Sequence, residues 1–220
     1  MTPPAHHPTD ETLLAYAAGT LPNVISCVVA CHLSLCAKCA GETRFLRMVG
    51  GVMLTELETQ PADEAAMNRM AERLVAEPLP ERRPEPAQPP PGDPWMPLPL
   101  SRYLGMRGEE VPWKTVVKGV RQHWIKLPRD PGQLRLLRLA PGKTLLEHTH
   151  TGMELTMVLQ GSYGDHTGAY LRGDIIEWEE GTDHQPRAFG AEECICLIAS
   201  ENIPYFHRLI ARLLRPIMGF

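Results

Sequence analysis

The sequence contains no long apolar run and no excess of basic charge. None of its apolar stretches reaches the 18 residues that suggest a membrane-spanning helix, so we expect neither a transmembrane segment nor membrane binding. Lysine and arginine total 22 against 26 aspartates and glutamates, which gives a net charge of −4. Duplex binding usually requires a basic stripe, so direct contact with nucleic acid is disfavoured.

The first residues lack the charged and apolar regions of a signal peptide, which predicts a cytoplasmic protein. Cysteine is limited to six residues, at positions 27, 31, 36, 39, 194 and 196. Four of them lie close to His32 in the sequence, and two form a Cys-x-Cys pair. In a reducing compartment such clusters indicate metal binding rather than a disulfide framework.

A proline-rich segment over residues 77–99 divides the chain. Proline lacks a backbone donor and disfavours helix in the residue before it, so this segment is predicted to be an extended linker. Residues 1–76 show helical periodicity, and residues 100–203 show the two-residue period of strands. Residues 204–220 form a basic amphipathic tail, which we expect to dock on the protein rather than on a membrane. The predicted fold class is α+β with two domains, an all-α bundle followed by an all-β sandwich or barrel.

Local signals place helices in the first part of the chain. Thr9 can cap a helix through Ala18, Gly19 can end it, and Pro22 suits the first turn of the next helix. Two further helices are predicted around residues 45–53 and 67–74. Such short helices cannot bury all their apolar side chains, so we expect a protein partner to cover some of them. The candidates for this surface are Leu13, Val28, Phe45, Leu46, Val52, Met67 and Leu74.

Strand-like segments follow in the second part. Alternation at Trp113, Thr115 and Val117 predicts one strand. Four more are predicted at residues 134–139, 155–159, 174–178 and 194–199.

A first metal site is predicted at His32, Cys36 and Cys39. On one continuous helix these side chains fall within an arc of about 60°. Imidazole and thiolate ligands suit tetrahedral zinc, which needs a fourth ligand from His6 or His7. The alternative is a pair of buried thiols next to a surface histidine.

The two other cysteines nearby, Cys27 and Cys31, point away from His32 on the same helical wheel. We interpret both as small core residues, with Cys31 a candidate redox-sensitive neighbour.

The amino-terminal part resembles the zinc-binding anti-sigma domain, and the resemblance to the ChrR type extends through the whole chain. It is carried by His6-His7-Pro-Thr-Asp, Leu14-Ala-Tyr-Ala-Ala-Gly19-Thr-Leu and Val29-Ala-Cys-His-Leu-Ser-Leu-Cys36. The resemblance implies a zinc site of His7, His32, Cys36 and Cys39. It also implies that the domain binds an extracytoplasmic-function (group IV) sigma factor and blocks its binding to RNA polymerase.

A second metal site is predicted at His148, His150, Glu154 and His184. Residues two apart on a strand face the same way, so His148 and His150 can point together into a barrel. The spacing resembles the metal motifs of the cupin jelly-roll barrel, although Glu179-Glu180-Gly181 and Ala188 depart from the second motif. We expect a second zinc here, whereas the ligand set also suits manganese, iron or nickel.

The remaining polar candidates carry no assigned role. Asp165, His166 and Glu177 are interpreted as solvated strand or loop residues. Cys194 and Cys196 are interpreted as packed core thiols, and the alternative is a redox-responsive pair.

The prediction from all these features is a two-domain regulator, not an enzyme. The helical domain would inhibit a sigma factor, and the cupin domain would sense an oxidative signal, which the resemblance suggests is singlet oxygen or an organic peroxide. No small-molecule substrate is required. The main alternative is a metal-dependent cupin dioxygenase or isomerase with a zinc-stapled accessory domain. A zinc-dependent DNA-binding module is weaker, since the basic stripe is missing.

Overall fold

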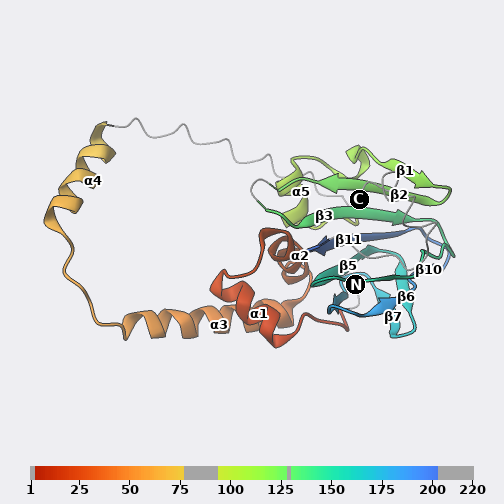
Figure 1. The fold of residues 1–220 in the computed structure, drawn as a ribbon, viewed down its shortest axis with the longest axis horizontal. Helices are drawn as coiled ribbons and strands as arrows, with labels where there is room; N and C mark the ends of the chain where they lie inside the picture. Colours follow the sequence, from red (N-terminus) through yellow and green to blue (C-terminus); the bar gives the residue numbers. More distant parts are fainter. Residues whose placement is uncertain (1–2, 77–93, 128–129, 203–220) are drawn as a thin grey trace.

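The computed structural model describes residues 3–76, 94–127 and 130–202. Helices form the first part of this chain and strands the second, as predicted (Figure 1). The described helices are α1 (Asp10–Ala18), α2 (Asn23–Leu33), α3 (Ala37–Thr55), α4 (Glu64–Ala76), α5 (Leu98–Leu104) and a 3-10 turn, η1 (Gly108–Glu110). The predicted tail at 204–220 and most of the predicted linker lie outside the described residues.

Helix α1 has the ends that its sequence predicts. The Thr9 side chain accepts a hydrogen bond from the Thr12 backbone N–H at 3.3 Å. Gly19 ends the helix in the left-handed conformation, with φ of 72°, which glycine adopts without strain. The predictions of a helix after Pro22 and of helices around residues 45–53 and 67–74 are also confirmed.

The prediction of one continuous helix carrying His32, Cys36 and Cys39 is wrong. Helix α2 ends at Leu33, and Cys36 has extended backbone angles as the N-cap of α3. On a continuous helix, residues 32 and 39 would be about 10 Å apart along the axis, too far to share one metal ion. The break between α2 and α3 removes this separation.

Eleven strands are described in the second part, in three sheets. A six-stranded sheet has the order β1-β2-β3-β11-β5-β8, a three-stranded sheet has the order β10-β6-β7, and β4 pairs with β9. Their bounds are β1 Lys114–Val117, β2 Val120–Ile125, β3 Gln133–Leu139, β4 His148–Thr149, β5 Glu154–Gln160, β6 Ser162–Asp165, β7 Gly168–Leu171, β8 Ile175–Trp178, β9 Asp183–His184, β10 Arg187–Phe189 and β11 Cys194–Ser200. The all-β part is confirmed, although the described pairings do not close it into one barrel.

The six-stranded sheet is buried on both faces at β11, one of its central strands. On strand β11, Cys194, Cys196 and Ile198 belong to a cluster on the inner face with Tyr163 and Trp178. The intervening residues of β11 belong to a second cluster, which also contains α2 and α5 side chains: Ile195, Leu197, Ala199, Val24, Val28 and Leu100. Helix α2 therefore packs on the outer face of the sheet, and one hydrophobic core joins the two predicted domains (Figure 1).

Helices α3 and α4 extend away from this shared core (Figure 1). No residue of α4 is buried, and only Cys39 and Thr43 are buried in α3. Among the described residues, no single helix is long and apolar enough to cross a membrane. Helices α1 and α2 pass that test only when taken together, as a pair bent by 108°.

Candidate metal centres

The structure brings His7, His32, Cys36 and Cys39 together into one cluster, the first centre. His7 comes from the segment before α1, His32 from the last turn of α2, and both cysteines from the start of α3. His7 Nδ1 lies 3.5 Å from Cys36 Sγ and 3.4 Å from Cys39 Sγ. These separations are close to the edge of a tetrahedron with zinc–ligand bonds of 2.0–2.3 Å, which is about 3.6 Å.

The state of His32 also suits a metal ligand. Its Nδ1 lies 2.8 Å from the Gly173 carbonyl oxygen, so this nitrogen carries the proton and donates it. Its Nε2 is buried and has no hydrogen-bond partner among the described residues. Burial lowers the pKa of His32, which favours the neutral imidazole that metals bind. The Nε2 lone pair, which has no hydrogen-bond donor and lies in the same cluster as two thiols, suits a bound cation.

The Cys39 thiol of the first centre holds its proton in the absence of metal. Burial, with the neighbouring Cys36, raises the pKa of Cys39 to about 12. A metal that binds as a thiolate complex must therefore displace that proton.

His6, the alternative ligand, points elsewhere. Its ring contacts Tyr170 with centroids 4.7 Å apart, and its Nδ1 lies 3.3 Å from Asp174 Oδ2. Cys27 and Cys31 also lie outside the cluster. They hydrogen-bond to each other within α2, and Cys31 is fully buried, as expected for a core residue.

The second centre consists of His148, His150, Glu154 and His184, all buried. Short strands β4 and β9 pair His148 with His184, and β5 begins at Glu154. His184 Nε2 lies 3.1 Å from both His148 Nε2 and His150 Nε2. Three ring nitrogens thus converge at nearly the spacing of imidazoles around one metal ion, which is about 3.3 Å.

Hydrogen bonds at Nδ1 fix the orientation of two of these rings. His184 Nδ1 donates to Asp165 Oδ2 at 3.0 Å, and His148 Nδ1 donates to the Leu146 carbonyl at 3.0 Å. The Nε2 atoms of both rings therefore present lone pairs to each other, which repel unless a cation lies between them. The interpretation of Asp165 as a solvated residue is wrong, since its side chain is only 1% exposed.

Glu154 completes the second centre as a carboxylate. Burial alone would raise the pKa of Glu154, but the hydrogen bond and charge of His150, with Arg135, lower it to about 2. Ser200 and Thr156 hydroxyls donate to its two oxygens. An ionised, oriented carboxylate beside three imidazoles fits a divalent metal.

The histidines of the second centre should make the metal-free protein acid-sensitive. Burial lowers the pKa of His148 from 6.5 to about 4 and that of His184 in the same direction. Between these pH values the unfolded chain binds a proton that the folded chain excludes, so the free energy of unfolding falls as pH falls. His148 alone contributes a loss of about 3 kcal/mol.

Urea unfolding of the chelator-treated protein at pH 7.5 and pH 4.5 measures this loss. His148→Gln removes the titrating group and should give a smaller difference between the two pH values. If the free energy of unfolding falls equally between the two pH values in both proteins, His148 is not the source of the acid sensitivity.

Cys194 and Cys196 are packed core thiols. Their sulfur atoms lie 3.6 Å apart, and both residues are fully buried on the inner face of β11. The neighbouring Cys194 and burial raise the pKa of Cys196, which keeps it protonated. Ala188, which stands where the cupin motif has asparagine, is buried in the same cluster.

Two acidic residues of β8 and the turn before it hold the helical lobe against the cupin-like domain, a role that the sequence did not predict. Glu177 was interpreted as solvated, but it accepts hydrogen bonds from the Thr9 backbone N–H at 2.8 Å and from the Thr12 hydroxyl. Asp174 was treated only as a strand residue, but it binds the segment before α1. The signal for this contact in the sequence was the run of six apolar residues that begins β11, because a strand with both faces buried requires a cover on each side.

Comparisons with known proteins agree with this architecture. A family model described as the ChrR Cupin-like domain matches residues 103–204. The anti-sigma-E factor ChrR of Cereibacter sphaeroides is 38% identical over 215 residues, covering 96% of each chain. A chain in the crystal structure of Rhodobacter sphaeroides SigE in complex with the anti-sigma ChrR is 36% identical, with a TM-score of 0.72 over 89% of this chain and 98% of that chain. An RmlC-like cupin protein from Ralstonia eutropha JMP134 is 21% identical, with a TM-score of 0.41 over 47% of this chain and 71% of that chain.

The chain combines a helical lobe, which carries a cluster of two histidines and two cysteines, with a cupin-like domain, which carries a second cluster. This combination defines an anti-sigma type of regulatory protein. The chain belongs to the ChrR family of anti-sigma factors. Membership of this family makes it a regulator and not an enzyme, which removes the dioxygenase or isomerase alternative.

Proposed function

We propose that this chain binds an extracytoplasmic-function sigma factor through α3 and α4 and keeps it from RNA polymerase. The observation that carries the proposal is an apolar surface with no cover in the described chain, together with the SigE complex of the related ChrR. The surface consists of Phe45, Met48, Val52, Met53 and Leu54 on α3 and Met67, Met70, Leu74 and Val75 on α4.

The exposure of these side chains is high for a monomer. All nine are at least 60% exposed, and those on α4 include Met67, Met70 and Leu74, at helical spacing along one face. Exposed apolar side chains gathered on a helix in this way mark a protein contact. Three of the seven side chains predicted for the partner surface do not belong to it. Leu13 and Val28 are buried in the shared core, and Leu46 is partly buried against that core.

The first centre would hold zinc, with His7, His32, Cys36 and Cys39 as ligands. Two nitrogens and two sulfurs suit tetrahedral zinc with no open position, as in structural sites. Zinc bound there would fix the start of α3 against α2, because the cluster spans the break between the two helices. It would therefore set the direction of the helix that carries part of the partner surface.

The second centre would also hold a metal, for which we propose zinc, with His148, His150, Glu154 and His184 as ligands. We propose that this domain senses an oxidant, singlet oxygen or an organic peroxide, and that a change there weakens the sigma complex. Strand β8 supports such communication. It ends at Trp178, which stacks on His150 of the second centre with ring centroids 5.9 Å apart. It begins two residues after Gly173, whose carbonyl contacts His32 of the first centre.

The test of sigma binding uses the full chain and the sigma factor encoded beside its gene. Gel filtration with light scattering should show a 1:1 complex, and stripping the metal with a strong chelator should reduce the affinity. A primary sigma factor serves as the control and should not bind. Absence of a complex with folded, zinc-loaded protein would overturn the proposal.

A further inference from the structure

The first centre lies against the cupin-like domain and not only within the helical lobe. The Gly173 carbonyl, in the turn between β7 and β8, accepts the Nδ1 proton of His32 at 2.8 Å. His32 and this contact are fully buried. A group of the cupin-like domain therefore fixes both the ring orientation and the tautomer of one ligand, since the Nδ1 proton leaves only Nε2 free to bind metal.

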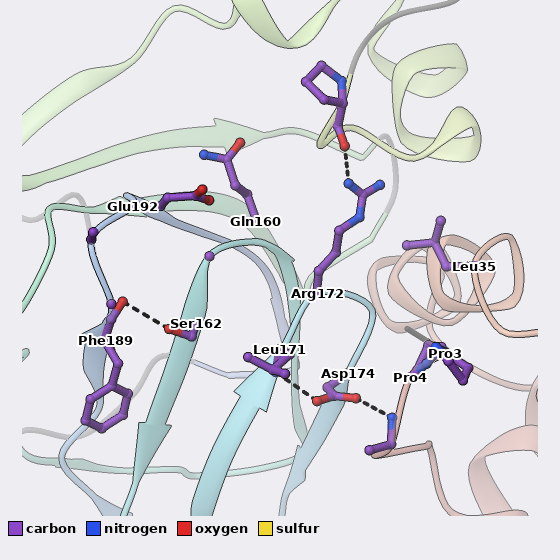
Figure 2. Close-up of a pocket in the computed structure, with 15 residues that line it drawn as sticks. Pro3, Pro4, Leu35, Gln160, Ser162, Leu171, Arg172, Asp174, Phe189 and Glu192 are labelled. Atoms are coloured by element: carbon purple, nitrogen blue, oxygen red, sulfur yellow. Dashed lines mark hydrogen bonds between the residues drawn. The ribbon is translucent and has the colours of Figure 1, made fainter. Parts of the chain in front are cut away.

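The next residue, Asp174, holds the segment that carries a second ligand, His7. One carboxylate oxygen accepts from the backbone N–H groups of Ala5 at 2.7 Å and His6 at 3.0 Å. The other accepts from the Leu171 N–H at 2.8 Å, within the β7–β8 turn. Figure 2 shows Asp174 between Leu171 and the segment that continues from Pro3 and Pro4.

Two further contacts fix the same segment. The Ile175 N–H donates to the His6 carbonyl at 3.3 Å, at the start of β8. Gly173 has φ of +93°, and a Cβ there would lie 2.8 Å from Pro4 Cγ, so only glycine allows this approach. The segment thus lies directly on the β7–β8 turn, beside a surface pocket of about 890 Å³.

We infer that Asp174 and the Gly173 carbonyl are positioning groups for the first metal centre while the helical lobe is docked on the cupin-like domain. The inference rests on the proposed binding of zinc at this centre. Zinc binding and docking are then linked, so docking strengthens zinc binding and zinc strengthens docking by the same factor. Two of the four ligands are oriented by groups of the cupin-like domain, while Cys36 and Cys39 are held by α3.

Asp174→Asn in the full chain tests the first half of this linkage. An amide offers one acceptor oxygen in place of two. The variant would therefore lose either the hydrogen bonds from the Ala5 and His6 N–H groups or the one from the Leu171 N–H. We expect zinc to leave the first centre about tenfold faster, the lower end of the range for changes to groups behind metal ligands. Cobalt substitution isolates this centre, because only its thiolates give a sulfur-to-cobalt charge-transfer band. Glu193→Gln is the matched control, since Glu193, just before β11, pairs with Arg121 of β2 and Arg138 of β3, away from the first centre.

The second half is tested from the opposite side, without altering the cupin-like domain. In Cys39→Ser, hydrogen exchange at the Ala5, His6 and Ile175 amides should be about tenfold faster than in the zinc-loaded wild type. A purely structural role of Asp174 in its own turn would leave Ile175 unchanged in this variant. This measurement decides the inference even if Asp174→Asn fails to fold.

The outcomes separate the inference from the proposed function. Unchanged metal release in folded Asp174→Asn, or unchanged exchange in Cys39→Ser, would overturn the inference and leave zinc and sigma binding standing. A wild-type chain whose first centre takes up neither zinc nor cobalt would overturn both.

Discussion

Replacing Cys39 with serine should release the sigma factor, with an increase of at least 100-fold in the dissociation constant of the complex. Structural zinc sites bind with apparent free energies of about 10–16 kcal/mol, and a hydroxyl is a poor substitute for a thiolate. A 100-fold change corresponds to only about 2.7 kcal/mol. The loss should act on the direction of α3, because α2 remains buried against the sheet through Val24, Ile25 and Val28.

The matched control is Cys27→Ser. Cys27 lies one turn before Cys31 in α2 and does not belong to the first centre. Titration calorimetry of both variants with the sigma factor, together with zinc content by atomic absorption, measures the effect. Tight binding by a zinc-deficient Cys39→Ser protein would show that the metal does not control the partner surface.

Replacing Met70 with glutamate should weaken sigma binding about 30-fold or more while leaving the free chain stable. Met70 is 64% exposed on α4, so the change removes no buried contact in the free protein. In the complex, a charge would be desolvated among apolar groups. Interface hot spots lose about 2 kcal/mol or more on truncation, which is about 30-fold, and a buried charge adds to that loss.

Ala65→Glu is the control for this change. It adds the same charge to α4 at a position about 170° around the helix from the apolar face. Its affinity for the sigma factor should stay within about twofold of wild type, and the melting temperatures of both variants should match the wild type. Equal affinities of the two variants would place the sigma contact elsewhere.

The shared core bears on how a signal could act. Helix α2 contributes to one continuous apolar cluster with β3, β5 and β11, so separating the two parts of the chain would expose a large buried surface. Helices α3 and α4 share little of that core. A small rearrangement at the first centre, which changes the direction of α3, would therefore cost less than separation of the domains.

The sequence by itself determined much of the local structure and the composition of both clusters. Thr9 and Gly19 bound α1 because an N-cap hydroxyl and a left-handed glycine act through residues next to them. His148 and His150 belong together because alternation along an extended chain is a local property. The comparison with ChrR then confirmed the family that the motifs indicated.

Only the tertiary structure decided how the parts meet. The break between α2 and α3 brings four ligand atoms to one point, which a continuous helix cannot do. The roles of Asp165, Asp174 and Glu177 depend on partners 19 to 169 residues away in the sequence. Such contacts leave no periodic pattern, because a buried carboxylate is stabilised by whichever donors the fold brings to it.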